Sequence, residues 1–235
     1  MDKYRIKQYL HLHQQRDDVD KNVFANIEPI DCGDYYHLES ASGLYKSYSQ
    51  IDIYEDKLVC KSGCRGVGEY KLNEFINCAI LEKSCVYVVD DITYKTDSEG
   101  RVCRVHASLP INDDIEVRPN GGNEIKKHSL EKSALDRDQA GHLIPRSLKG
   151  PNEAINIVPM SWDLNESSYN YVEKHISQFR DCKVEWVETI KYEGVSLRPV
   201  CFEITCSVYG RHVIKAKFGN PKSKYDSIIH IIQTY

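Results

Sequence analysis

The sequence predicts an α+β protein with a mainly antiparallel sheet, and three observations support this prediction. Several short runs are rich in β-branched and aromatic residues, turn-forming residues separate these runs, and one long stretch has helical periodicity. The 235 residues are enough for one domain or two. We expect a small mixed N-terminal module over residues 1–89 and a larger domain over residues 90–235.

The N-terminal module is expected to contain two helices and two strands. No catalytic constellation is recognisable in it, so its role stays open, and an adaptor or delivery module is one hypothesis. The expected elements are helices over 3–16 and 71–81 and strands over 51–54 and 57–60.

The larger domain begins with a β-hairpin and a polar loop. Residues 86–94 and 101–109 have strand composition, and Thr96-Asp-Ser-Glu-Gly100 supplies the turn. Residues 110–128 contain two prolines and adjacent glycines, which indicates a loop. Two short apolar segments follow at 141–144 and 155–158, the second ended by Pro159.

One amphipathic helix and three strands complete the predicted domain. The helix covers residues 163–180, because its apolar side chains recur near one face. The strands are expected at 182–192, 200–209 and 212–218, with Tyr209-Gly210-Arg211 as the last turn.

Composition and hydropathy argue against a membrane protein but do not indicate a particular activity. The net charge is −4 and hydrophobic residues make up 41%, which is ordinary for a soluble protein. No apolar run approaches the roughly 18 residues that span a bilayer, and the N-terminus lacks the apolar core of a signal peptide. We therefore expect no membrane partner, and a cytoplasmic protein or one delivered by a specialised secretion system. The nine cysteines have scattered spacings, which favours free thiols over a disulfide framework.

Three residues supply what phosphodiester hydrolysis requires. A histidine such as His142 can take a proton from water near neutral pH. A divalent cation can neutralise the charge that develops on the phosphate, and Mg²⁺ prefers oxygen ligands such as those of Asn165 and Glu173. On a regular helix these two residues are eight positions and about 80° apart, so both can border one site.

Several short motifs follow one another in the second half of the chain: Gln139-Ala-Gly-His142, Asn156-Ile-Val-Pro159, Leu164-Asn165 and Glu173. In order and spacing they resemble the DNA/RNA non-specific endonucleases of the ββα-metal, or His-Me finger, superfamily. The resemblance covers roughly residues 90–220 and is closest to the branch found in bacterial polymorphic toxins.

This resemblance implies a ββα-metal core and a role for each residue. His142 would activate water, Asn165 would bind a single Mg²⁺ or Mn²⁺ directly, Glu173 would bind a metal water, and Asn156 would support the site. The family often has Asp and Arg where this chain has Gln139 and Ala140. The arginine that stabilises the transition state must then come from elsewhere.

The expected arginines are Arg137 and Arg146, with Arg101 and Arg198 behind them. Arg198 is interpreted mainly as a residue that positions a strand. Asp136 and Asp138 could form a second metal pair, but surface charge is the preferred interpretation of both.

The expected function is a metal-dependent, non-specific endonuclease acting on DNA, RNA or both. One hypothesis makes it a bacterial toxin effector, with an immunity or inhibitor protein as its partner. The alternative is a catalytically impaired nucleic-acid-binding protein with a nuclease fold, because of the departures at Gln139 and Ala140. The combination of His142, Asn165 and Glu173 favours the enzyme, because binding alone requires neither a base nor a metal ligand.

Overall fold

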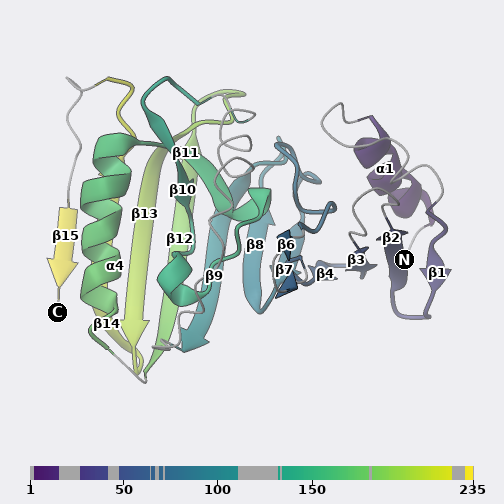
Figure 1. The fold of residues 1–235 in the computed structure, drawn as a ribbon, viewed down its shortest axis with the longest axis horizontal. Coiled ribbons are helices and arrows are strands. Elements are labelled where there is room, and N and C mark those ends of the chain that lie inside the picture. Colours follow the sequence, from purple (N-terminus) through teal and green to yellow (C-terminus); the bar gives the residue numbers. More distant parts are fainter. Residues whose placement is uncertain are drawn as a thin grey trace.

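A long, almost entirely antiparallel sheet organises the molecule (Figure 1). Its eleven strands have the order β1-β2-β3-β4-β7-β8-β9-β12-β13-β14-β15, and only the pair β4–β7 is parallel. The computed structural model describes residues 3–15, 27–41, 48–63, 65–66, 69–70, 72–110, 132, 134–179, 182–223 and 231–234.

The N-terminal part supplies helix α1 and one end of the sheet. Helix α1 spans Lys3–Gln14, within the predicted 3–16, and lies at the opposite end of the molecule from helix α4 (Figure 1). The strands are β1 (Ile30–Asp31), β2 (Tyr36–Ala41), β3 (Tyr48–Ile53), β4 (Leu58–Cys60) and a separate small pair, β5 (Arg65–Gly66) and β6 (Glu69–Tyr70).

The predicted helix over 71–81 is wrong. Residues 72–81 form turns and bends instead. The side chain of Asn73 accepts a hydrogen bond from the Phe75 amide and donates to the carbonyls of Gln50 and Lys61. These side-chain bonds give the backbone an alternative to helix formation, as asparagine commonly does.

The rest of the sheet matches the predicted meander with one correction. Residues 86–94 form two strands, because Asp90 and Asp91 turn the chain with positive φ angles of 47° and 70°. The loop predicted at 110–128 lies outside the described residues beyond Pro110. The strands are β7 (Val86–Val89), β8 (Ile92–Thr96), β9 (Val102–Pro110), β12 (Lys183–Tyr192), β13 (Pro199–Val208), β14 (Arg211–Gly219) and β15 (Ile231–Thr234).

The predicted domain boundary at 89/90 falls between two hydrogen-bonded strands. β7 and β8 pair antiparallel, so the sheet is continuous across this point. Buried side chains from both sides of it, such as Tyr9, Phe75 and Trp186, belong to one hydrophobic core. The two-domain division stays a prediction, but the hydrophobic core is continuous across the predicted boundary.

A second, two-stranded sheet and a helix lie over one face of the large sheet (Figure 1). β10 (Asp138–His142) pairs antiparallel with β11 (Ile157–Ser161). Pro159 does not end the strand as predicted but lies inside β11, which a two-stranded sheet tolerates because each strand keeps one unpaired edge. Two short 3-10 helices, η1 (Arg146–Leu148) and η2 (Ala154–Asn156), connect the strands.

The predicted helix at 163–180 is shorter and begins irregularly. Leu164–Tyr169 forms a π-helical segment, η3, which continues as α-helix α4 over Asn170–Ile176. The Tyr169 ring contacts the rings of Phe202 and Phe218 on the large sheet, with centroids 5.5 Å and 5.8 Å away. π-Helical turns are rare and occur frequently at functional sites, and this one contains Asn165.

No described helix is long and apolar enough to cross a membrane. The cysteines that the structure describes are free, as predicted.

Candidate active site

His142 is the last residue of β10, and the sequence around it requires close packing. A Cβ atom on Gly141 would lie 2.7 Å from the Cε atom of Met160 on β11, so only glycine fits before the histidine. The side chain of His142 is half-buried. Its Nε2 atom lies 2.7 Å from Oδ1 of Asn152, in the loop that returns the chain to β11.

This hydrogen bond sets the tautomer of the imidazole. Asn152 presents an oxygen, so Nε2 of a neutral His142 carries the proton and donates it. The lone pair then belongs to Nδ1. A ring held at one nitrogen, with its lone pair on the other, has the form that a general base needs.

Asn156 holds this loop from the interior. Its side chain is fully buried, and Oδ1 accepts hydrogen bonds from the Tyr94 hydroxyl at 3.1 Å and the Ile144 amide at 2.9 Å. Its Nδ2 donates to the carbonyls of Ile144 and Pro151, both at 3.0 Å. All four hydrogen-bonding positions of the amide are used. Asn156 therefore has the geometry of a supporting residue and not of one that meets substrate.

A buried carboxylate ties the same loop to the N-terminal part. Glu153 accepts hydrogen bonds from the backbone amides of Gly63, at 2.7 Å, and Asn73, at 3.2 Å, and from Asn77 Nδ2. Burial raises the pKa of Glu153 to about 7, although these donors act in the opposite direction. Glu153 adjoins Asn152, so residues from the N-terminal part hold the residue next to the partner of His142.

Asn165 lies at the start of the helix and contacts β10. Its Nδ2 donates to Oε1 of Gln139 at 2.6 Å. The amide oxygen therefore points away from Gln139, and within the described part of the chain it accepts no hydrogen bond. Gln139, a departure from the family pattern, thus fixes the orientation of the amide.

An amide oxygen fixed in this way fits a hard divalent cation. Mg²⁺ binds oxygen ligands, keeps several waters, and needs few protein donors. Among the described residues, no group of three or more His, Cys, Asp or Glu is arranged to hold a metal ion. The oxygen of Asn165 is one donor that such a cation could use, and Gln139 would be the outer residue that orients it.

Glu173 lies on α4, where it lines a small cavity with Pro145, Ser147 and Trp186. Desolvation raises the pKa of its carboxyl to about 7. No hydrogen bond or ion pair reaches this carboxylate from the residues that the structure describes. Asn165 and Glu173 are on one continuous helical segment, but the structure shows no contact between them. The expected angle of about 80° between them assumed a regular α-helix, and it does not apply because the segment begins with π-helical turns.

The four candidate arginines have different surroundings. Arg137 is exposed and directly precedes β10, while Arg146 is half-exposed on η1, four residues after His142. Arg101 is bound to Asp97 and to the carbonyls of Gly194 and Ser196. That arrangement is structural.

Arg198 also has a structural role, because it forms a buried ion pair with Asp138. Asp138 is therefore not the surface charge that the sequence predicted. The guanidinium of Arg198 donates to both carboxylate oxygens of Asp138, at 2.7 Å and 2.8 Å, and both side chains are buried. This bidentate pair attaches β10 to the loop before β13. Asp136 is exposed, in agreement with a surface charge.

Sequence reasoning missed Asn152 and Glu153 and misjudged Gln139. The available signal was an Asn-Glu pair between Pro151 and a run of apolar residues, because polar residues in a buried stretch require partners. Gln139 was recognised only as a departure, because its contact with Asn165 depends on how the helix packs against β10.

β10 thus carries both His142, which is held by an amide, and Gln139, which orients the amide of Asn165, on a mainly antiparallel scaffold. The sequence identifies the family. Residues 83–210 match the family model described as DNA/RNA non-specific endonuclease, which covers more than half of the chain. The chain therefore belongs to this family, as the resemblance predicted, and the family supports nuclease activity on nucleic acid.

Proposed function

We propose that this protein is a metal-dependent endonuclease that hydrolyses phosphodiester bonds in DNA, RNA or both. In this proposal β10, β11 and the helix formed by η3 and α4 are a ββα-metal core. The observation that carries the proposal is the composition of β10. This one strand bears both His142 and Gln139, which orients the amide of Asn165.

His142 is the proposed general base. Its Nδ1 lone pair accepts a proton from the attacking water, while the Nε2 hydrogen bond to Asn152 keeps the ring in position. Asn156 and Gly141 support this arrangement by fixing the backbone on either side of the strand end.

Asn165 is the proposed direct ligand of Mg²⁺ or Mn²⁺, through its amide oxygen. The cation, when bound, supplies Lewis-acid stabilisation of the charge on the phosphate and the leaving oxygen. Glu173 is proposed to reach the metal through water. Its helix carries Asn165, and its carboxylate has no described partner to compete with such a role.

Arg146 and Arg137 are the proposed phosphate-binding arginines. Both retain the exposure that contact with substrate requires, unlike Arg101 and Arg198. They lie at opposite ends of β10, so each would meet a different part of the substrate strand. Arg146 follows His142 closely and is the better candidate for charge stabilisation at the scissile phosphate.

Plasmid cleavage tests the metal dependence. The purified chain should nick and linearise plasmid DNA with Mg²⁺ or Mn²⁺ and lose this activity in excess EDTA. Undiminished cleavage in EDTA would contradict the proposal. Nucleic-acid binding without cleavage under any divalent ion would instead favour the catalytically impaired binding protein.

The toxin role and an immunity protein are proposed from the resemblance alone. Expression of the active chain should damage bacterial nucleic acid and arrest growth unless a neutralising partner is present, and the His142→Ala variant should be harmless. Normal growth of cells that express active enzyme without any partner gene would count against both.

A further inference from the structure

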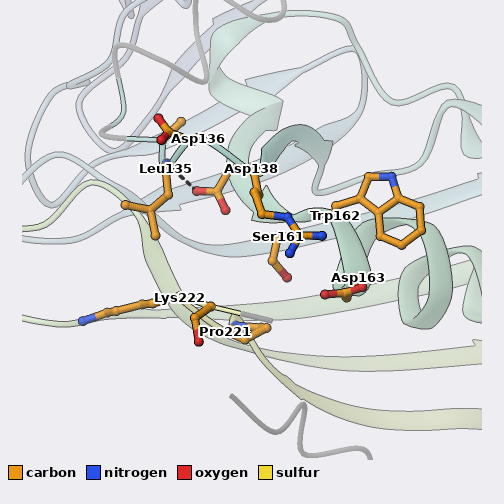
Figure 2. Close-up of a pocket in the computed structure, with 11 residues that line it drawn as sticks. Leu135, Asp136, Asp138, Ser161, Trp162, Asp163, Pro221 and Lys222 are labelled. Carbon is orange, nitrogen blue, oxygen red and sulfur yellow. Dashed lines mark hydrogen bonds between the residues drawn. The ribbon is translucent and has the colours of Figure 1, made fainter. Parts of the chain in front are cut away.

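A hollow of about 340 Å³ opens at the junction of β11 with the helical segment that carries Asn165 (Figure 2). Its walls come from the segment before β10, from the junction of β11 with the helix, and from Pro221 and Lys222 after β14. The junction residues end at Asp163, two positions before Asn165 in the chain. Asp138 and Asp163 of its lining are within two positions of Gln139 and Asn165 in the chain, so the hollow is built on the same segments as the proposed site. Its volume falls within the range of small-ligand pockets.

Trp162 provides an exposed aromatic wall of this hollow. The residue before it, Ser161, is buried, whereas the Trp162 side chain is 50% exposed. Its backbone amide donates to the carbonyl of Arg137 at 3.3 Å, which ties the two sides of the hollow together. An indole held at the edge of a substrate-binding site is well suited to stack on a planar ring.

The charged side chains of the hollow favour a base over a phosphate. The side chains of Asp136, Arg137 and Asp163 have no hydrogen-bond or ion-pair partner among the residues that the structure describes. Asp136 and Asp163 would repel a phosphate, but each can accept a hydrogen bond from an exocyclic amino group. Arg137 can donate to ring nitrogens and carbonyl oxygens. Asp138 is excluded from this set, because Arg198 already binds it.

We propose that the hollow binds one unpaired base of the substrate strand, stacked on Trp162 and contacted at its edge by Arg137 and Asp163. The inference rests on the proposed nuclease function and adds a substrate preference to it. A base inside a duplex is stacked and paired, so it can enter only from a single strand or a locally opened one. The enzyme should therefore prefer unpaired substrate.

Tryptophan fluorescence tests this inference directly. The chain has two tryptophans, and Trp186 is fully buried. In EDTA, a single-stranded oligonucleotide should quench the emission of Trp162, while an abasic oligonucleotide of equal length should bind roughly tenfold to hundredfold more weakly. The Trp162→Phe variant should lose the quenching. Anisotropy of a labelled oligonucleotide measures binding independently of the tryptophan signal.

Two substitutions of Trp162 and one control separate the loss of stacking from general damage to the protein. Trp162→Ala should weaken binding of the base-containing oligonucleotide roughly tenfold to hundredfold, and Trp162→Phe by less, because it keeps a ring. Tyr171→Ala is the matched control, because Tyr171 is 49% exposed on the same helical segment, and it should bind like the unmodified protein. Melting curves should show that all three variants are folded.

Equal affinity for the abasic and base-containing strands would overturn the inference, as would a Trp162→Ala variant that binds as tightly as Tyr171→Ala. These results are independent of the nuclease proposal. Quenching without plasmid cleavage would support the base-binding subsite and contradict the nuclease activity. Cleavage with Mg²⁺ but without quenching would support the nuclease activity and contradict the subsite.

Discussion

Oδ1 of Asn152 lies 2.7 Å from Nε2 of His142, and this contact assigns each nitrogen of the ring its role. Asn152 is 2% exposed, and its Nδ2 is a buried donor without a hydrogen-bond acceptor in the described part of the molecule. A buried amide usually has both of its ends satisfied. Its placement is explained if its function is to orient the imidazole.

Substitution of Asn152 should change the pH profile as well as the rate. Asn152→Ala should lower kcat roughly tenfold to hundredfold, because a ring displaced by a fraction of an ångström accepts the proton of the attacking water less well. Asn152→Asp should place a carboxylate beside the ring, stabilise the imidazolium, and move the acidic limb of the pH–rate profile upward by roughly one unit. A merely structural Asn152 would change the melting temperature and leave the position of that limb unaltered.

His142→Ala should abolish most of the catalysis without unfolding the protein. The loss should be about 10²–10⁴ in rate, the usual contribution of a positioned base. Activity of the unmodified protein should also fall on acidification, because protonation of the imidazole removes the lone pair that accepts the proton of the water. His106→Ala on the exposed face of β9 is the matched control and should keep full activity. Near-normal cleavage by His142→Ala, with a much lower melting temperature, would make His142 a structural residue.

Asn165 and Gln139 should affect metal affinity and not the base. Asn165→Ala should lose activity together with Mn²⁺ affinity measured by calorimetry, with partial rescue at high metal concentration. Gln139→Ala should weaken the same affinity by roughly 10–100-fold, the usual effect of removing a residue that orients a ligand. Asn170→Ala, five residues further along the helix, should bind metal normally. Unchanged metal affinity in Asn165→Ala would remove that residue from the ligand set.

Glu188 should make stability depend on pH. Burial raises the pKa of its carboxyl to about 8, while Tyr169 and Trp186 donate hydrogen bonds to it. Because the folded pKa lies above the unfolded value of about 4.5, this stabilising contribution is fully present below pH 4.5. It is lost as the pH rises through about 8, by up to about 1.4 kcal/mol per pH unit.

Urea denaturation from pH 5 to pH 9 measures this effect. Glu188→Gln keeps a neutral side chain at every pH, so the fall in the free energy of unfolding should be smaller in this variant. Glu185→Gln, an exposed neighbour on the same strand, is the control and should leave the pH dependence unchanged. An identical pH dependence in Glu188→Gln and the unmodified protein would show that Glu188 is not the group responsible.

Several features of the fold could be predicted from the sequence because they depend on local patterns. The alternation of apolar residues located β9, β12, β13 and β14, and the helical periodicity located the helix that carries Asn165. Where tertiary contacts replaced local preference, the predictions failed. The expected helix at 71–81 became turns because Asn73 bonds to distant carbonyls, and Pro159 entered β11 because its strand has an unpaired edge.

The sequence by itself determined the family and the candidate residues, because the order and spacing of the motifs can be read without knowing how the chain packs. Only the tertiary structure decided which residues hold the candidate residues in place. Asn152 is hydrogen-bonded to His142, Gln139 to Asn165, and Gly63 of the N-terminal part to Glu153. It also showed Asn156 to be buried and Asp138 to be the partner of Arg198. The physical reason is that each of these bonds joins residues 10 to 90 positions apart. A hydrogen bond of that kind depends on the three-dimensional approach of two elements, which no local pattern records.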